Sequence, residues 1–113
     1  MKAFAFNPQT QLLSPSGASP ETFKYPGPTP SVSSNGNANA IVWITADDAY
    51  GNGGNAVLHA YNATNLSHEL YNSAQNPSRD AAGLATKFTA TTVANGLVFV
   101  AAQNEVDMYG LLP

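Results

Sequence analysis

The feature that most constrains how this chain can fold is a strand–turn–strand unit that occurs twice. One copy is PSVSSNGNANAIVWI at 30–44 and the other is TTVANGLVFVAAQ at 91–103, each centred on an Asn-Gly pair. Asn and Gly tolerate the positive φ angles of tight turns, so each copy is predicted to form an antiparallel hairpin. The similarity continues from LHAY at 58–61 to VDMY at 106–109, with a longer Gly/Asn-rich loop in the first copy.

Repeats built from short strands are typical of β-propellers, whose blades are four-stranded antiparallel sheets. We therefore expect a single all-β domain made of antiparallel β-propeller blades, with about two blade equivalents in the chain. Residues 1–29 would supply a partial blade and a Pro-rich loop, residues 30–73 a full blade, and residues 87–113 a partial C-terminal blade. The opening MKAF is interpreted as a third copy of the aromatic strand, with Phe4 in the place of Tyr61.

The segments between these hairpins are predicted to be mostly loops. The prolines between residues 14 and 30 exclude a helix or a central strand, apart from a short strand at 22–25. A strand is predicted at 69–71; a helix over 64–72 is the alternative, which the density of Asn and Ser disfavours. Residues 74–85 are expected to form a loop.

Four segments of the chain resemble a known family: YPGPTPSVSSNG, AIVWI, LHAYNATNLSHELYNS and KFTATTVANGLVFVAAQNEVDMYGLL. They are similar to the C-terminal end of secreted bacterial β-propellers with PQQ-like repeats. The resemblance implies a propeller fold and an extracytoplasmic location for the parent protein. The blade-docking Gly and Trp that often follow the third strand of quinoprotein blades are missing after Tyr61. No quinone or calcium ligand can be carried over, so part of a quinoprotein-like oxidoreductase is only a distant alternative.

Composition excludes several classes of protein. The chain carries four Lys and Arg residues, scattered and without a patch, and its net charge is −3. A nucleic-acid partner is not expected, because such proteins need clustered cations to displace counterions from phosphates. The chain has no Cys, so disulfides and thiolate metal sites are excluded. No apolar run is long enough to cross a bilayer and no export signal is recognised, so membrane insertion is not expected and the location of this chain stays open.

Aromatic residues are the candidate ligand-binding groups. Tyr50, Tyr61 and Tyr71 are candidate stacking platforms for a carbohydrate, because a sugar ring can lie against an exposed aromatic face. Trp43 is a further candidate, but its apolar neighbours in AIVWIT predict that it belongs to the core. No cofactor is expected.

The titratable residues suggest no catalytic set. Asp47 and Asp48 open a loop rich in oxygen ligands and are weak calcium candidates, although a solvated turn fits their spacing better. His59 and His68 lack further ligands at a metal-site spacing, so structural roles are favoured. Asp107 lies within a strand and would line a central channel or pair with a neighbouring strand; the polar, outward face of a half-exposed strand is the favoured alternative.

The sequence thus predicts a non-catalytic structural or assembly module whose partner is a copy of itself. Propellers close with typically four to eight blades, and this chain supplies about two. We expect the strand at 11–14 of one copy to complete the last blade of the next by strand exchange, with MKAFAF displaced. The alternative is a carbohydrate-binding propeller that uses exposed tyrosines; an enzyme ranks third.

Overall fold

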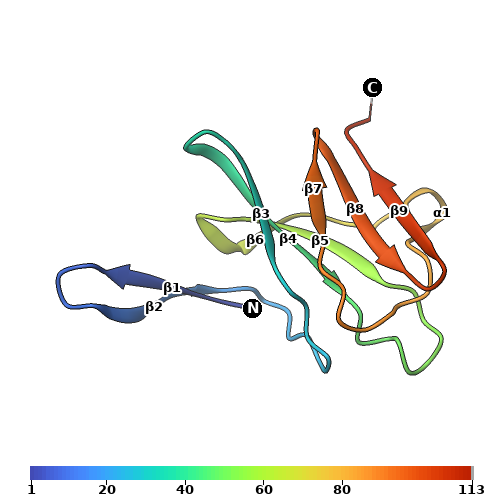
Figure 1. Cartoon of the computed structure of the whole chain (residues 1–113), viewed down its shortest axis with the longest axis horizontal. Coiled ribbons are helices and arrows are strands. Elements are labelled where there is room, and N and C mark those ends of the chain that lie inside the picture. The colour runs from blue at the N-terminus through green and yellow to red at the C-terminus, as the bar shows by residue number, and fades with distance from the viewer. Residues whose placement is uncertain (113) are drawn as a thin grey trace.

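The computed structural model describes residues 1–112, and almost all regular structure in them is β-strand (Figure 1). Alternating apolar residues, many of them β-branched or aromatic, favour strands, and Asn, Gly and Pro separate them. The elements in chain order are β1 (Lys2–Asn7), β2 (Leu12–Ala18), β3 (Ser31–Asn35), β4 (Ala38–Ala46), β5 (Val57–Asn62), β6 (Asn65–Asn72), the single helical turn α1 (Pro77–Asp80), β7 (Thr92–Ala94), β8 (Leu97–Ala102) and β9 (Glu105–Tyr109).

The strands form three antiparallel sheets, each in sequence order. β1 and β2 form an N-terminal hairpin, β3 to β6 form a central sheet, and β7 to β9 form a C-terminal sheet. The predicted all-β class with antiparallel sheets is therefore confirmed. The hairpin extends away from the rest of the molecule at one end, and the C-terminal sheet lies at the other (Figure 1).

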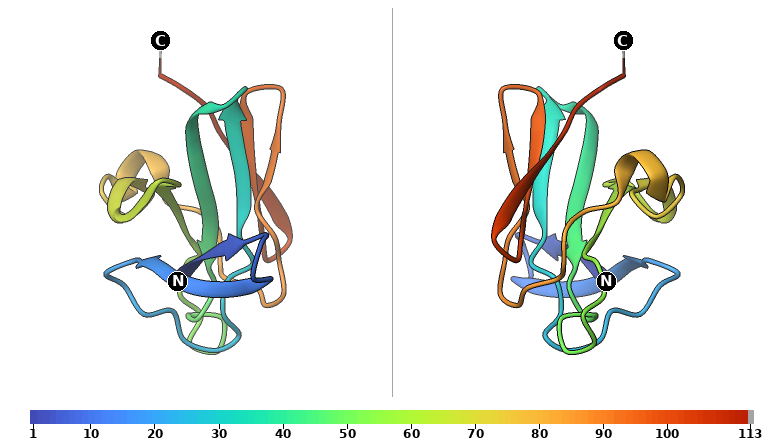
Figure 2. Two further views of the ribbon diagram at one scale, coloured as in Figure 1. Left: turned by 90° about the vertical axis from the view of Figure 1, so that its left-hand side faces the viewer. Right: turned by 90° about the vertical axis from the view of Figure 1, so that its right-hand side faces the viewer.

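The central sheet lies between the other two, and Figure 2 views the molecule from the hairpin side and from the C-terminal side. Successive residues of a strand point to opposite faces, so β4 and β5 contribute to two separate cores. The core on the hairpin side comprises Val42, Ile44, Tyr61 and Leu66, with Met1, Ala3 and Phe23 packed against it. The core on the C-terminal side comprises Ala56, Leu58, Ala82, Ala85, Val98 and Val100.

The two copies of the repeated sequence also have the same structure, because their strands pair in the same register. Ile44 pairs with His59 between β4 and β5, and Val100 pairs with Asp107 between β8 and β9. LHAY of β5 and VDMY of β9 therefore occupy equivalent places, as predicted. The longer loop of the first copy connects β4 to β5, where the second copy has only a tight turn between β8 and β9.

The structure corrects the predicted place of the first aromatic residue. β1 and β5 both end at an Asn, Asn7 or Asn62, whose side-chain oxygen accepts a hydrogen bond from the backbone N–H two residues later. These matching turns make Phe6, rather than Phe4, the equivalent of Tyr61. Phe4 lies two residues earlier on the same side of the strand, which is why the sequence pattern did not separate the two.

Several predicted boundaries also change. β2 continues to Ala18 through Pro15, which is tolerated because only one edge of β2 is paired. Residues 22–25 do not form a strand. The strand predicted at 69–71 is present and is longer than expected, Asn65–Asn72, and the alternative helix over 64–72 is wrong. Within the expected loop 74–85, the chain makes the single helical turn α1.

Candidate functional site

The hairpin and the C-terminal sheet are the two outer sheets of the molecule. Each exposes a face that corresponds to a buried face of the central sheet. Tyr61 on β5 is fully buried, whereas its equivalent Phe6 on β1 is 60% exposed. Leu58 on β5 is also fully buried, whereas its equivalent Val106 on β9 is 65% exposed. The repeat thus has two apolar faces, and each terminal sheet leaves one of them without a neighbour among residues 1–112.

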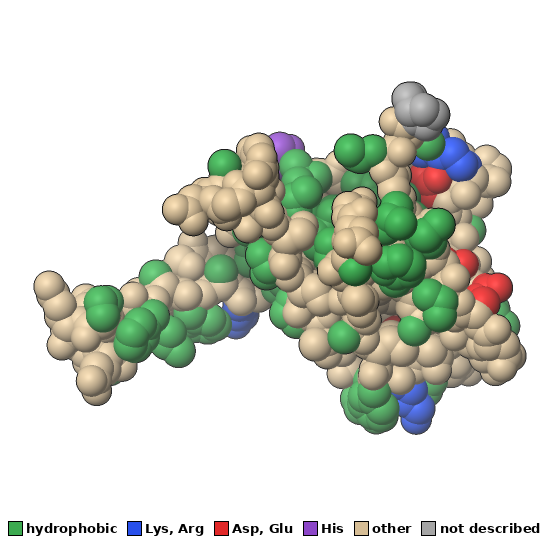
Figure 3. All heavy atoms as spheres, turned by 45° about the horizontal axis from the view of Figure 1, so that its top comes forward, with side chains coloured by type: hydrophobic (Ala, Val, Ile, Leu, Met, Phe, Trp, Pro, Cys, Tyr) green, Lys and Arg blue, Asp and Glu red, His purple; other side chains and the backbone are tan. Residues whose placement is uncertain are grey.

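We name these surfaces by their residues. The N-face lies on the hairpin and consists of Phe4, Phe6 and Leu13, whose strand pairing places them on one side. The C-face lies on the C-terminal sheet and consists of Leu97, Phe99, Ala101, Val106 and Met108. These residues are all uncharged, and Lys2 lies at the edge of the N-face, on the same side of β1 as Phe4. Figure 3 shows the hydrophobic side chains along the protruding arm formed by the hairpin.

A groove of about 910 Å³ lies between the central and C-terminal sheets. Trp43 borders this groove and is only half-buried; its Nε1 donates a hydrogen bond of 2.8 Å to Ser33 Oγ. Trp43 packs against the core on the C-terminal side, as predicted. It is only half-buried because the C-terminal sheet covers only part of this face.

Tyr71 and Asp107 also line the groove. Burial, together with the nearby Asp80 carboxylate, raises the pKa of Tyr71 to about 12, so this phenol stays protonated at neutral pH. Asp107 Oδ2 accepts a hydrogen bond of 2.9 Å from the backbone N–H of Gly83. Asp107 therefore fixes the loop that follows α1, and it faces the central sheet rather than solvent or a channel.

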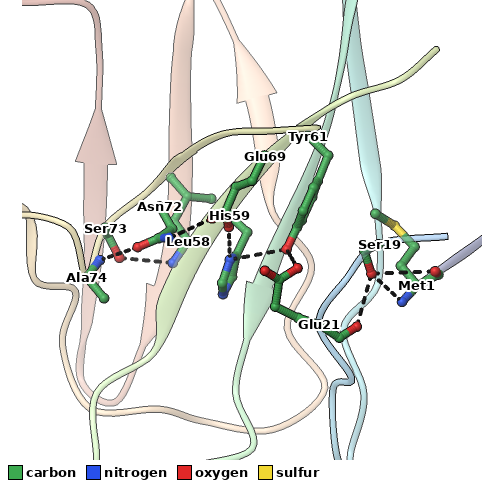
Figure 4. A network of polar contacts seen from close by, with 10 residues as sticks. All are labelled: Met1, Ser19, Glu21, Leu58, His59, Tyr61, Glu69, Asn72, Ser73 and Ala74. Atoms are coloured by element: carbon green, nitrogen blue, oxygen red, sulfur yellow. Dashed lines mark hydrogen bonds and ion pairs between the residues drawn. The ribbon is translucent and has the colours of Figure 1, made fainter. Parts of the chain in front are cut away.

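His59 belongs to a polar network on the hairpin side of the central sheet (Figure 4). Its Nδ1 lies 2.6 Å from Glu69 Oε1, and the Tyr61 ring stacks on the imidazole. The Tyr61 hydroxyl donates a hydrogen bond of 2.6 Å to Glu21 Oε2 in the segment that follows the hairpin. The network therefore joins the N-terminal segment to the central sheet.

The pKa values in this network follow from its contacts. Burial acts to raise the pKa of Glu69, but hydrogen bonds from His59 and Asn72 outweigh it and leave this pKa below its usual value. Burial and the bond to Glu21 raise the pKa of Tyr61. His68 is exposed and is not part of the network. Among residues 1–112, no group of three His, Asp or Glu side chains is placed to hold a metal ion.

The two calcium candidates, Asp47 and Asp48, differ in their exposure to solvent. Asp48 is exposed, whereas Asp47 is buried and its Oδ1 has no hydrogen-bond partner. Burial raises the pKa of Asp47, and the backbone N–H groups of Asp47 itself and of Phe88 partly offset this rise. Asp47 thus contacts the segment before β7, which the sequence spacing did not reveal.

The three predicted tyrosine platforms do not form one surface. Tyr61 has no exposed surface, which contradicts its predicted role as an exposed platform; its hydroxyl is used within the protein. Tyr71 lines the groove, and Tyr50 lies in the β4–β5 loop at another place.

An aromatic group around Tyr50 was missed by the sequence analysis. The rings of Tyr25 and Tyr50 are 6.3 Å apart between centroids, and Tyr25 and Phe88 are also 6.3 Å apart. Lys87 Nζ lies 4.8 Å from the centre of the Tyr50 ring. Tyr25 and Phe88 are far apart in the sequence, so only their convergence in the structure reveals the group.

Comparison of the chain with protein-family models, with curated proteins and with solved structures gives no match. Within residues 1–112, no helix is long and apolar enough to cross a membrane. The geometry of the chain itself must therefore support any functional assignment.

Proposed function

We propose that this protein is a non-catalytic structural module that assembles by stacking copies of its sheets head to tail, as the blades of a propeller stack. The observation that carries the proposal is the contrast within the repeat. Leu58 and Tyr61 are fully buried inside the chain, whereas their equivalents Val106 and Phe6 are mostly exposed at its two ends. The packing of the central sheet between its two neighbours thus indicates how the exposed face of each outer sheet would be covered by another copy.

The occupant of the C-face is the N-face of a second copy. Inside the chain, the face of the central sheet that carries Leu58 is covered by the side of the next sheet that carries Tyr109. Phe6 lies on the side equivalent to that of Tyr109, so the hairpin offers the matching surface. The residues of the two faces are uncharged, and Lys2, at the edge of the N-face, is long enough to keep its ammonium in water, so stacking would bury apolar area without desolvating an ion.

Such a contact uses different surfaces on the two copies. It is therefore heterologous, and successive copies close into a ring or continue as an open array according to the rotation between them. β1 and β2 are already hydrogen-bonded to each other, so stacking requires neither strand to leave the hairpin. The strand exchange expected from the sequence would instead add β2 to the free edge of β9 after the hairpin opens.

The test measures mass by light scattering at low micromolar concentration. The wild-type chain is expected above monomer mass, and Phe6→Glu and Met108→Glu are each expected to be monomeric because a charge would be buried in the contact. Gln9→Glu and Gln103→Glu, in exposed turns, are the matched charge controls and should leave the mass unchanged.

Mixing the two interface variants separates head-to-tail stacking from a two-fold dimer. The Phe6→Glu chain keeps an intact C-face and the Met108→Glu chain keeps an intact N-face, so an equimolar mixture should form a dimer and nothing larger. A wild-type monomer at these concentrations, or a mixture that stays monomeric, would refute the proposal.

A further inference from the structure

Three loops that are distant in the sequence bring aromatic rings together at one end of the sheets. Tyr25 lies in the β2–β3 connection, Tyr50 in the β4–β5 loop and Phe88 in the segment between α1 and β7. These connections gather at the lower end of the molecule in Figure 1. Tyr25 lies between the other two rings and meets each in an edge-to-face arrangement.

The group is open to solvent. Tyr25 is 65% exposed and Phe88 is 74% exposed, while Tyr50 is half-buried. The three rings lie on loops at the edge of the sheets, so stacking of the N-face on the C-face would not directly cover them. Their exposure therefore needs an explanation separate from assembly.

The backbone at Phe88 is held in an unusual conformation. Its φ is +64°, in the left-handed region that bulky side chains rarely adopt. Asp47, directly after β4, is buried, and the backbone N–H of Phe88 is one of the groups that act on its carboxylate. Conformations of this kind are concentrated at binding sites.

A positive charge completes the surface. Lys87 Nζ lies 4.8 Å from the centre of the Tyr50 ring and 5.9 Å from that of Phe88. Within residues 1–112, no carboxylate lies within ion-pair distance of this ammonium. The charge is therefore available to a ligand that also contacts the rings.

We propose that Tyr25, Tyr50, Phe88 and Lys87 form a binding site for an acidic saccharide. Exposed aromatic faces fit the C–H surface of a pyranose ring, and the ammonium fits the carboxylate of a uronic acid. The rings are open on the protein surface, which suits an internal unit of a polymer. A nucleic acid is disfavoured because binding its backbone requires several clustered cations to displace counterions, whereas Lys87 is the one cation placed beside these rings and can pair with a single carboxylate.

The test is titration with an oligogalacturonate, with a neutral gluco-oligosaccharide of equal length as the matched ligand, followed by NMR chemical shifts and calorimetry. The acidic ligand should bind more tightly and perturb the signals of the aromatic group. Tyr25→Ala and Phe88→Gly should each weaken it at least about fivefold. Glycine is used at 88 because it accepts the positive φ, so this variant should keep the fold.

Lys87→Gln should remove the preference for the acidic ligand, and added salt should reduce binding to the wild type but have little effect on this variant. Leu70→Ala, on β6 and outside both the N-face and the C-face, is the control for loss of an exposed apolar side chain elsewhere, and its affinity should equal that of the wild type. Absence of binding, equal affinity for acidic and neutral ligands, or equal weakening by Leu70→Ala would overturn the proposal. Because the readout is ligand affinity, its failure is distinguishable from failure of self-assembly.

Discussion

Replacing Leu58 and Val106 by Ala in turn tests the repeat at two equivalent positions with opposite surroundings. Leu58 is fully buried, and its backbone is fixed by a hydrogen bond of 3.1 Å from its N–H to Ser73 Oγ, so the site has little freedom to collapse. Removing three buried carbon atoms costs about 2.4 kcal/mol in transfer free energy, and the remaining cavity brings the loss to about 3–4 kcal/mol. Val106 loses two carbon atoms that are mostly in water already, which costs about 0.5 kcal/mol.

The assay is urea unfolding followed by circular dichroism, at a protein concentration where light scattering finds monomer. Leu58→Ala should lower the free energy of unfolding by several times more than Val106→Ala, with an unchanged dependence on urea. At higher concentration the cost of Val106→Ala should rise, because assembly stabilises only the folded chain. Equal costs at low concentration would refute the assignment of Leu58 and Val106 to covered and uncovered copies of one position.

Three further predictions concern the polar groups. Tyr61→Phe removes the hydroxyl bonded to Glu21 and should destabilise the chain by about 1–2 kcal/mol, with faster amide exchange in β1 and β2 by mass spectrometry. Asp47→Asn should increase stability at neutral pH, because Asn is uncharged like the protonated aspartate. The pKa of Asp47 is raised in the folded state, so the protonated carboxyl favours folding at low pH, and this contribution is lost as pH rises through the folded pKa. Glu69→Gln should weaken the fall in stability at acidic pH. The pKa of Glu69 is lowered in the folded state, so its carboxylate stabilises the fold at pH values above the usual glutamate pKa, and this contribution is lost as pH falls through the folded pKa. Thermal melts across pH, with each variant compared with the wild type, measure both effects, and profiles that coincide with that of the wild type would contradict them.

The sequence was sufficient for the features that depend on local chemistry. The Asn-Gly pairs identified both hairpins, and the pattern shared by LHAY and VDMY identified equivalent strands. It was insufficient where two residues satisfy the same pattern. Phe4 and Phe6 lie on one side of a strand with a period of two, so only the turn at Asn7 decides which of them matches Tyr61.

The candidate site depends mostly on contacts between distant segments. Tyr61 is buried because the N-terminal segment packs over it and Glu21 meets its hydroxyl, and no local pattern encodes either contact. Tyr25 and Phe88 come together only because the sheets align their loops at one end. An alternating pattern also cannot tell which faces of a sheet have neighbours, which is why exposure of Val106 required the structure.

The order of the three sheets has a consequence for how the chain loses its structure. The hairpin and the C-terminal sheet each pack on the central sheet, from opposite sides. The first junction relies on the bond between Tyr61 and Glu21, and the second includes a bond of 2.9 Å between the hydroxyls of Thr45 and Thr91. Such an arrangement is a short linear array, in which stability is a sum over units and nearest-neighbour junctions. We therefore expect the hairpin to detach in a step of its own, while the central and C-terminal sheets, which share one core, unfold together.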